Sequence, residues 1–144
     1  MRLHLPLALA AASLLAGCAT ATAQKDDDVD TALSRMLAGE SATQGAALDA
    51  ALADASEHPL GSSENPVRAS MPAGQRAYLN RLRCADGSAP SYNRVGNFGE
   101  GVYGNIVDGY QVTCPGKEPQ MVVMDMYHSG YVENRPVPGF TIVR

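Results

Sequence analysis

The sequence has no tryptophan, only two phenylalanines and only three cysteines among its 144 residues. Charged residues make up 18%, and the 11 Lys and Arg are outnumbered by 15 Asp and Glu. A chain of this length supports one folded domain at most, which excludes kinases, TIM barrels and two-domain dehydrogenases. Because proteins that bind nucleic acids through phosphates need an excess of basic residues, the net charge of -4 argues against a nucleic-acid partner.

The longest apolar run lies at the amino terminus. Arg2 precedes an apolar stretch over residues 3–15. That length matches the hydrophobic region of a signal peptide and is too short to span a bilayer. The stretch ends in Leu15-Ala16-Gly17-Cys18. We therefore expect residues 1–17 to be an export signal and not part of the fold.

Leu15-Ala16-Gly17-Cys18 resembles the lipobox of bacterial lipoproteins. The resemblance implies that Cys18 becomes the lipidated amino terminus, and that Ala19 after it favours the outer membrane, with the protein facing the periplasm. Several acyl chains anchor a protein stably without crossing the bilayer. The alternative is cleavage after Ala23 at the A-x-A pattern of residues 21–23, which would release a soluble periplasmic protein.

Either cleavage leaves the same two downstream cysteines, Cys84 and Cys114. In an oxidising compartment such a pair most simply forms one disulfide. A redox pair or a metal pair would usually show the close C-x-x-C spacing, which these residues lack. We predict a structural bridge between them.

The chain after the signal divides into an acidic spacer over residues 18–57 and a folded domain over 58–144. Residues 24–57 hold nine alanines and no aromatic residue. The run 25–30 is expected to be disordered, a short helix is predicted from Asp30 to Leu37, and a second helix follows from the apolar spacing over 47–55.

Residues 58–144 predict a small α+β domain. Pro72 suits the first turn of a short helix, and Leu82 and Cys84 alternate with arginines as in a strand. Residues 110–114 and 121–127 flank a Pro/Gly turn and predict a hairpin, and residues 140–143 predict a last edge strand. We expect an antiparallel sheet of about four strands with one helix and one disulfide. This part also looks like small uncharacterised envelope proteins of Gram-negative bacteria, a resemblance that implies no activity.

A glycine motif and an arginine group are the first candidate binding features. Gly99, Gly101 and Gly104 match G-x-G-x-x-G, but no apolar strand precedes them and no helix follows, so we interpret them as a loop or bulged strand where a partner docks. Positive charge concentrates at four arginines that could hold an anionic group: Arg76, Arg81, Arg83 and Arg94.

Residues 121–128 carry the other candidate chemistry. On a strand Met124, Met126 and His128 would share one face, and thioethers beside an imidazole suit Cu(I). Asp125, His128 and Ser129 contain the residue types of a hydrolase, but on a strand Asp125 and His128 would point to opposite faces.

The preferred interpretation is a non-catalytic binding module for an envelope protein, glycan or lipid, tethered to the membrane and without a resident cofactor. A periplasmic Cu(I) protein is the first alternative, and a small hydrolase is the second.

Overall fold

The computed structural model describes the backbone of residues 21–144 and the side chains of residues 29–144. The signal segment and Cys18 therefore lie outside the described residues. The helices are α1 (Ala21–Leu37), α2 (Gly45–Ala55) and α3 (Met71–Arg81). The strands are β1 (Val67–Ser70), β2 (Leu82–Arg83), β3 (Ser91–Glu100), β4 (Ile106–Thr113), β5 (Gln120–Asp125), β6 (Tyr127–Val132) and β7 (Thr141–Ile142). None of the helices in the described part combines the length and the apolar character needed to cross a bilayer.

The main sheet has five strands in the order β3-β4-β5-β1-β6. The α+β class is confirmed, but the prediction of an antiparallel sheet of about four strands is wrong. β1 lies between β5 and β6 and runs parallel to β5, with Val67 opposite Met124. Sequence reasoning missed β1 because it has four residues and follows a turn-rich linker. β2 and β7 form a separate two-stranded sheet.

Several local predictions are confirmed. The hairpin pairs β4 with β5, with Tyr110 opposite Val122. Pro72 lies in the first turn of α3, where its missing N–H costs no helical hydrogen bond. β3, by contrast, was not predicted as a strand. It has register shifts after Arg94 and after Asn97, which explains its lack of regular alternation. The disulfide between Cys84 and Cys114 is formed and ties β2 to the end of β4.

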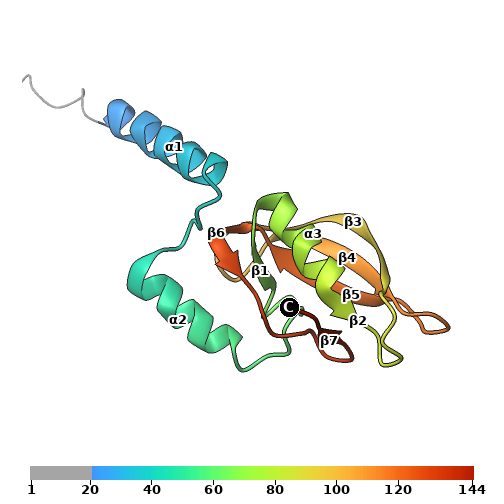
Figure 1. Cartoon of the computed structure of the whole chain (residues 1–144). Helices are drawn as coiled ribbons and strands as arrows, with labels where there is room; N and C mark the ends of the chain where they lie inside the picture. Colours follow the sequence, from blue (N-terminus) through green and yellow to red (C-terminus); the bar gives the residue numbers. More distant parts are fainter. Residues whose placement is uncertain (1–20) are drawn as a thin grey trace, which may run out of the picture.

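The core lies between α3 and one face of the main sheet (Figure 1). Its largest members are Tyr78, Leu79, Leu82, Tyr110, Val122 and Met124. Each large apolar side chain buried in this way contributes about 1.5–3 kcal/mol to folding. Because side chains alternate along a strand, the residues between these core positions face the opposite side of the sheet.

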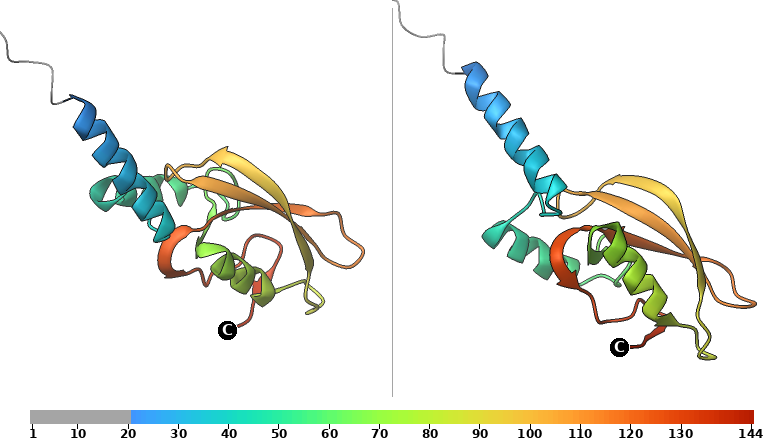
Figure 2. Two further views of the ribbon diagram at one scale, coloured as in Figure 1. Left: turned by 90° about the horizontal axis from the view of Figure 1, so that it is seen from above. Right: turned by 45° about the horizontal axis from the view of Figure 1, so that its top comes forward.

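The amino-terminal helices lie outside this core. α1 extends away from the sheet, as both views of Figure 2 show, and leaves four apolar side chains exposed: Val29, Leu33, Met36 and Leu37. α1 also begins at Ala21, earlier than the predicted start at Asp30, so the acidic run 25–30 that we expected to be disordered lies within it. α2 matches the predicted second helix and buries only Ala55 completely.

A short connector, residues 39–44, joins α1 to α2 and is hydrogen-bonded to the loop between β3 and β4. The backbone N–H of Ala42 donates to Asn105 Oδ1 at 2.8 Å, and the N–H of Thr43 donates to the carbonyl of Tyr103 at 3.3 Å. Asn105 Nδ2 in turn donates to Asp125 Oδ2 at 2.8 Å. The connector is therefore anchored, through the loop between β3 and β4, to a buried carboxylate of β5.

Candidate functional site

Three of the four arginines predicted from the sequence are engaged in interactions within the chain. Arg94 is ion-paired with Asp108 at 2.7 Å, and that carboxylate raises the pKa of the guanidinium. Arg83 donates to two carbonyls near the end of α3, at 2.9 and 2.6 Å. Arg81 donates to the side chain of Asn134 and to the backbone carbonyl of Glu133, which follows β6. Arg76 alone is exposed without a hydrogen bond or ion pair to a described residue.

The glycine motif lies at the tip of the hairpin formed by β3 and β4. Gly99 and Gly104 have φ angles of +85° and +75°, which side-chain-bearing residues rarely adopt. The backbone N–H groups of Gly99, Gly101 and Gly104 all donate to oxygen atoms within the hairpin. Because these donors are used, the loop serves as a turn and offers no cradle of free N–H groups for a phosphate.

The predicted methionine and histidine face is not formed. β5 ends at Asp125 and β6 begins at Tyr127, so the run is not one continuous strand. Met124 belongs to the core beneath α3, whereas His128 lies on the other side of the sheet with Asp125. The prediction that these residues share a face is therefore wrong, because the chain turns at Met126.

The same turn brings Asp125 and His128 together, which corrects the expectation that they point to opposite faces. Asp125 Oδ2 lies 3.4 Å from His128 Nε2, and the two side chains are 0% and 5% exposed. The separation is within ion-pair range, but Nε2 makes no hydrogen bond to a described residue. The edge of Tyr103 packs against the imidazole with ring centroids 5.2 Å apart.

A basic hollow lies beside this cluster, between the carboxyl end of α2 and strands β1 and β6. It has a volume of about 290 Å³. We call it the arginine pocket, and its polar lining consists of Ser56, Asn65, Arg68, Tyr103, Tyr131 and Arg135. Leu52 of α2 contributes the apolar part of the wall.

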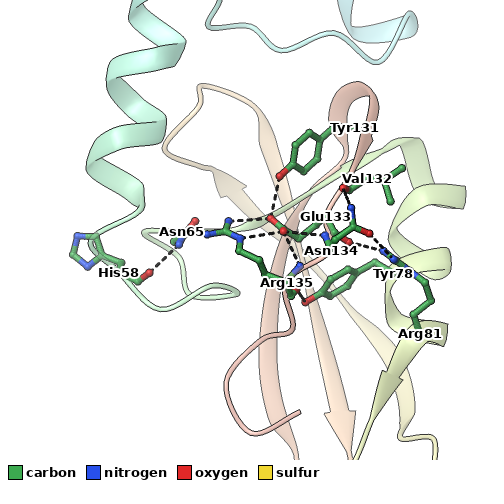
Figure 3. A network of polar contacts seen from close by, with 9 residues as sticks. All are labelled: His58, Asn65, Tyr78, Arg81, Tyr131, Val132, Glu133, Asn134 and Arg135. Atoms are coloured by element: carbon green, nitrogen blue, oxygen red, sulfur yellow. Dashed lines mark hydrogen bonds and ion pairs between the residues drawn. The ribbon is translucent and has the colours of Figure 1, made fainter. Parts of the chain in front are cut away.

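Glu133 holds one of the two arginines of this pocket in place. Figure 3 shows its carboxylate at the centre of a network that includes Tyr131, Asn134 and Arg135. Five hydrogen bonds reach this carboxylate, three of them from Arg135. Burial alone would raise the pKa of Glu133, but the hydrogen bonds from Arg135 outweigh it, so the pKa lies below its usual value.

The second arginine, Arg68, is held by an aromatic ring. Its guanidinium lies 3.9 Å from the centroid of Tyr131. A guanidinium over a tyrosine face gains about 0.5–2 kcal/mol while its N–H groups stay free at the edge. Among residues 29–144, no carboxylate lies within ion-pair distance of Arg68 and no acceptor takes a hydrogen bond from it. Its positive charge is thus available to a ligand.

The floor of the pocket is formed by Tyr103, which is 1% exposed. Burial raises the pKa of its hydroxyl, and the nearby charges of Arg68 and Arg135 partly oppose that rise, which places all three groups in one electrostatic environment. The side chains that line the pocket include two guanidiniums and no carboxylate, and Glu133 beside them offsets one of these charges. Asp125, which is not part of the lining, also acts on Tyr103. The lining is therefore positive, although the carboxyl end of a helix such as α2 carries a partial charge of about -0.5.

Sequence reasoning missed Arg68 and Arg135. Arg68 follows the turn-rich linker 58–66, and Arg135 lies directly before Pro136 near the chain end, so neither stood in a recognisable motif. Glu133 two residues before Arg135 was the one available signal, because alternating opposite charges at this spacing can pair within one extended segment.

Within residues 29–144, no group of three or more His, Cys, Asp or Glu side chains is arranged to hold a metal ion. A search of protein-family models, of curated proteins and of solved structures returned no match to the chain.

Proposed function

We propose that this protein is a lipid-anchored binding module of the bacterial envelope, and that its folded domain holds a small anionic group in the arginine pocket. The observation that carries the proposal is the pair of guanidiniums, Arg68 and Arg135, that converge on one pocket with the buried Tyr103 at its floor. One guanidinium has no carboxylate partner among the described residues, and the other is fixed by Glu133.

The pocket chemistry supports a carboxylate or a phosphate as the bound group. Guanidinium N–H groups form paired, charge-assisted hydrogen bonds with either anion. Asn65 and Ser56 add polar atoms to the lining, and Leu52 adds an apolar wall. A volume of about 290 Å³ lies at the small end of the range for ligand sites, so the group has the size of one sugar or amino acid.

The tether follows from the lipobox and from the helical spacer. Acylation at Cys18 would place the anchor three residues before the start of α1 at Ala21. A helix of 17 residues spans about 25 Å at about 1.5 Å per residue. The spacer is thus long enough to hold the folded domain away from the membrane surface, where it can meet an envelope ligand.

The binding experiment is a calorimetric titration of the full exported protein, in detergent, with galacturonate and with galactose. Galacturonate has about 13 non-hydrogen atoms, and at about -0.3 kcal/mol per atom we expect a Kd near 1 mM. The neutral sugar lacks the carboxylate and should bind at least tenfold more weakly. Inorganic phosphate serves as a second anionic probe of the same pocket.

Arg68→Gln is the decisive variant, because it removes the unpaired charge without uncovering Glu133. We expect galacturonate affinity to fall at least tenfold. Arg76→Gln removes the same charge from an exposed site on α3 and should leave the affinity within twofold. Equal losses in both variants, or no binding of either anion by the unaltered protein, would contradict an anion site in this pocket.

The tether is tested separately by mass spectrometry of the membrane fraction. We expect acyl chains on Cys18 and the loss of membrane association in Cys18→Ser. A soluble protein that begins at Gln24 would instead support cleavage after Ala23 and would remove the lipid anchor from the proposal.

A further inference from the structure

We infer that the ligand of the arginine pocket is an acidic oligosaccharide, whose charged sugar occupies that pocket and whose neutral sugars extend along an adjoining groove. This inference rests on the proposed function, because it assigns a ligand class to the same site. It adds a second binding region, one that contains no arginine or lysine.

The adjoining groove has a volume of about 460 Å³ and lies beneath α2, along β6. We call it the β6 groove, and its lining side chains are Glu40, Ser41, Gln44, Leu48, Tyr127, His128, Ser129 and Tyr131. Its one carboxylate, Glu40, disfavours a second acidic group and is compatible with neutral sugars. Tyr131 also lines the arginine pocket, so the two hollows share this residue.

α2 forms a common wall over both hollows. Leu48 lines the β6 groove, and Leu52, one helical turn later, lines the arginine pocket. The helix is held at its two ends rather than along its length. The connector before it is bonded to the Asn105 side chain, and after it the Asn65 amide donates to the carbonyl of His58 at 2.8 Å. Both hollows therefore lie under the same helix, on the face that carries Leu48 and Leu52.

The lining of the β6 groove suits neutral sugars. Sugar rings offer C–H faces that pack on aromatic rings and hydroxyl groups that both donate and accept hydrogen bonds. Tyr127 supplies a half-buried ring, and Gln44 and Ser129 supply exposed polar side chains. His128 supplies an imidazole whose Nε2 is turned toward Asp125, which leaves the opposite ring nitrogen, Nδ1, for the groove.

An extended acidic peptide is the competing ligand, since β6 is the outermost strand of the sheet. A peptide would bind by adding a strand to that edge, which requires a regular row of backbone groups. β6 does not offer one. Its register with β1 shifts between Ala69 and Ser70, Gly130 has a φ of +74°, and the Gly130 N–H donates to the Ser70 hydroxyl. The strand curls strongly in both views of Figure 2.

The experiment compares ligands of equal charge and increasing length on the full exported protein. The probes are glucuronate, a disaccharide of one glucuronate and one neutral sugar, and a trisaccharide of one glucuronate and two neutral sugars. Because each carries a single carboxylate, a gain in affinity with length reports contacts with the neutral sugars. We expect the disaccharide to bind at least tenfold more tightly than the monosaccharide.

Gln44→Ala and Tyr127→Ala test the groove, and Asn93→Ala on the exposed strand β3 is the matched control. The groove variants should reduce the gain with length to about twofold while glucuronate affinity stays within twofold of the unaltered protein. Gln44 is exposed and makes no side-chain cap to α2, so Gln44→Ala remains informative if Tyr127→Ala fails to fold. Asn93→Ala should change neither quantity.

Two outcomes overturn the inference and leave the anion site standing. In the first, glucuronate binds and Arg68→Gln weakens it, but affinity does not rise with length. In the second, a tripeptide with one glutamate binds more tightly than the trisaccharide. If the unaltered protein does not bind glucuronate at all, the anion site itself is contradicted. The two failures are therefore distinguishable.

Discussion

Glu133 and Arg135, two residues apart just after β6, form a clamp in which the glutamate is buried and the arginine is exposed. Arg135 donates to the Glu133 carboxylate from its backbone nitrogen at 2.9 Å, from Nε at 3.1 Å and from Nη2 at 3.0 Å. The Glu133 side chain is 3% exposed, whereas the Arg135 side chain is 61% exposed. The clamp therefore leaves one side of Arg135 free for solvent or ligand, and it sets the direction of the guanidinium before any ligand arrives.

Replacing the carboxylate should loosen this clamp. Glu133→Gln keeps the shape but loses the charge and two good acceptor positions. We expect a loss of about 1–2 kcal/mol in the free energy of unfolding, below the 3–5 kcal/mol of fully buried pairs, because the exposed guanidinium can be hydrated. Urea unfolding measures this loss of stability. Glu118→Gln, on the exposed turn after β4, should change stability by less than about 0.5 kcal/mol.

The same pair predicts how stability depends on pH. The pKa of Glu133 is lowered in the folded state, so folding is favoured while the carboxylate is ionised. The stability difference between the unaltered protein and Glu133→Gln should be constant above the ordinary glutamate pKa of 4.5. It should shrink as the pH falls below that value through the lowered pKa. A difference that persists unchanged at pH 2 would show that the ionised carboxylate is not its source.

Gly109 and Gly96 face each other across β4 and β3 and should respond differently to a methyl group. A Cβ on Gly109 would lie 2.3 Å from the Phe98 ring, whereas one on Gly96 would meet nothing within 4 Å. We expect Gly109→Ala to destabilise the protein by about 1 kcal/mol, the low end of the cost of overpacking, because the Phe98 ring is 44% exposed and can move aside. Gly96→Ala should be neutral or stabilising by up to about 1 kcal/mol, because alanine restricts the unfolded chain. Thermal unfolding of the two variants measures this difference. Equal losses of stability in both variants would contradict this packing.

Removing the disulfide should destabilise the domain without changing its topology. Cys84 and Cys114 are 30 residues apart, and closing a loop of that size contributes about 3–4 kcal/mol in the chain-entropy treatment. The double variant Cys84→Ser, Cys114→Ser should lose that amount in denaturant unfolding. The unaltered protein should lose a similar amount in a strong reductant, and a loss in only one of the two comparisons would argue against the bridge as the cause.

The connector between α1 and α2 should become mobile when its anchor is removed. Asn105→Ala deletes the acceptor of the Ala42 N–H and the donor to Asp125. We expect amide hydrogen exchange at Ala42 and Thr43 to accelerate at least tenfold, with the exchange rates of β4 and β5 changing little. Asn93→Ala, which lies on exposed β3, should leave the connector unchanged. Global acceleration would show instead that Asn105 supports the whole fold.

Local features of the fold followed directly from sequence pattern. Pro72 marked the start of α3, the apolar spacing around Leu48 marked α2, and the turn after Cys114 marked the hairpin of β4 and β5. Each of these signals involves residues within about ten positions of one another. The bulges of β3 and the break at Met126 erased the regular alternation on which strand prediction depends, so the faces of Met124 and His128 were assigned incorrectly.

The sequence by itself determined the oxidisable cysteine pair, the α+β class and the division into an acidic, alanine-rich part and an aromatic-rich part. Only the tertiary structure decided that β1 inserts beside β5, and that Arg68 and Arg135, far apart in the chain, share one pocket. The reason is that composition and periodicity report local preferences. A pocket depends on which distant strands pair with one another. That pairing is set by the burial of the whole sheet face that packs against α3.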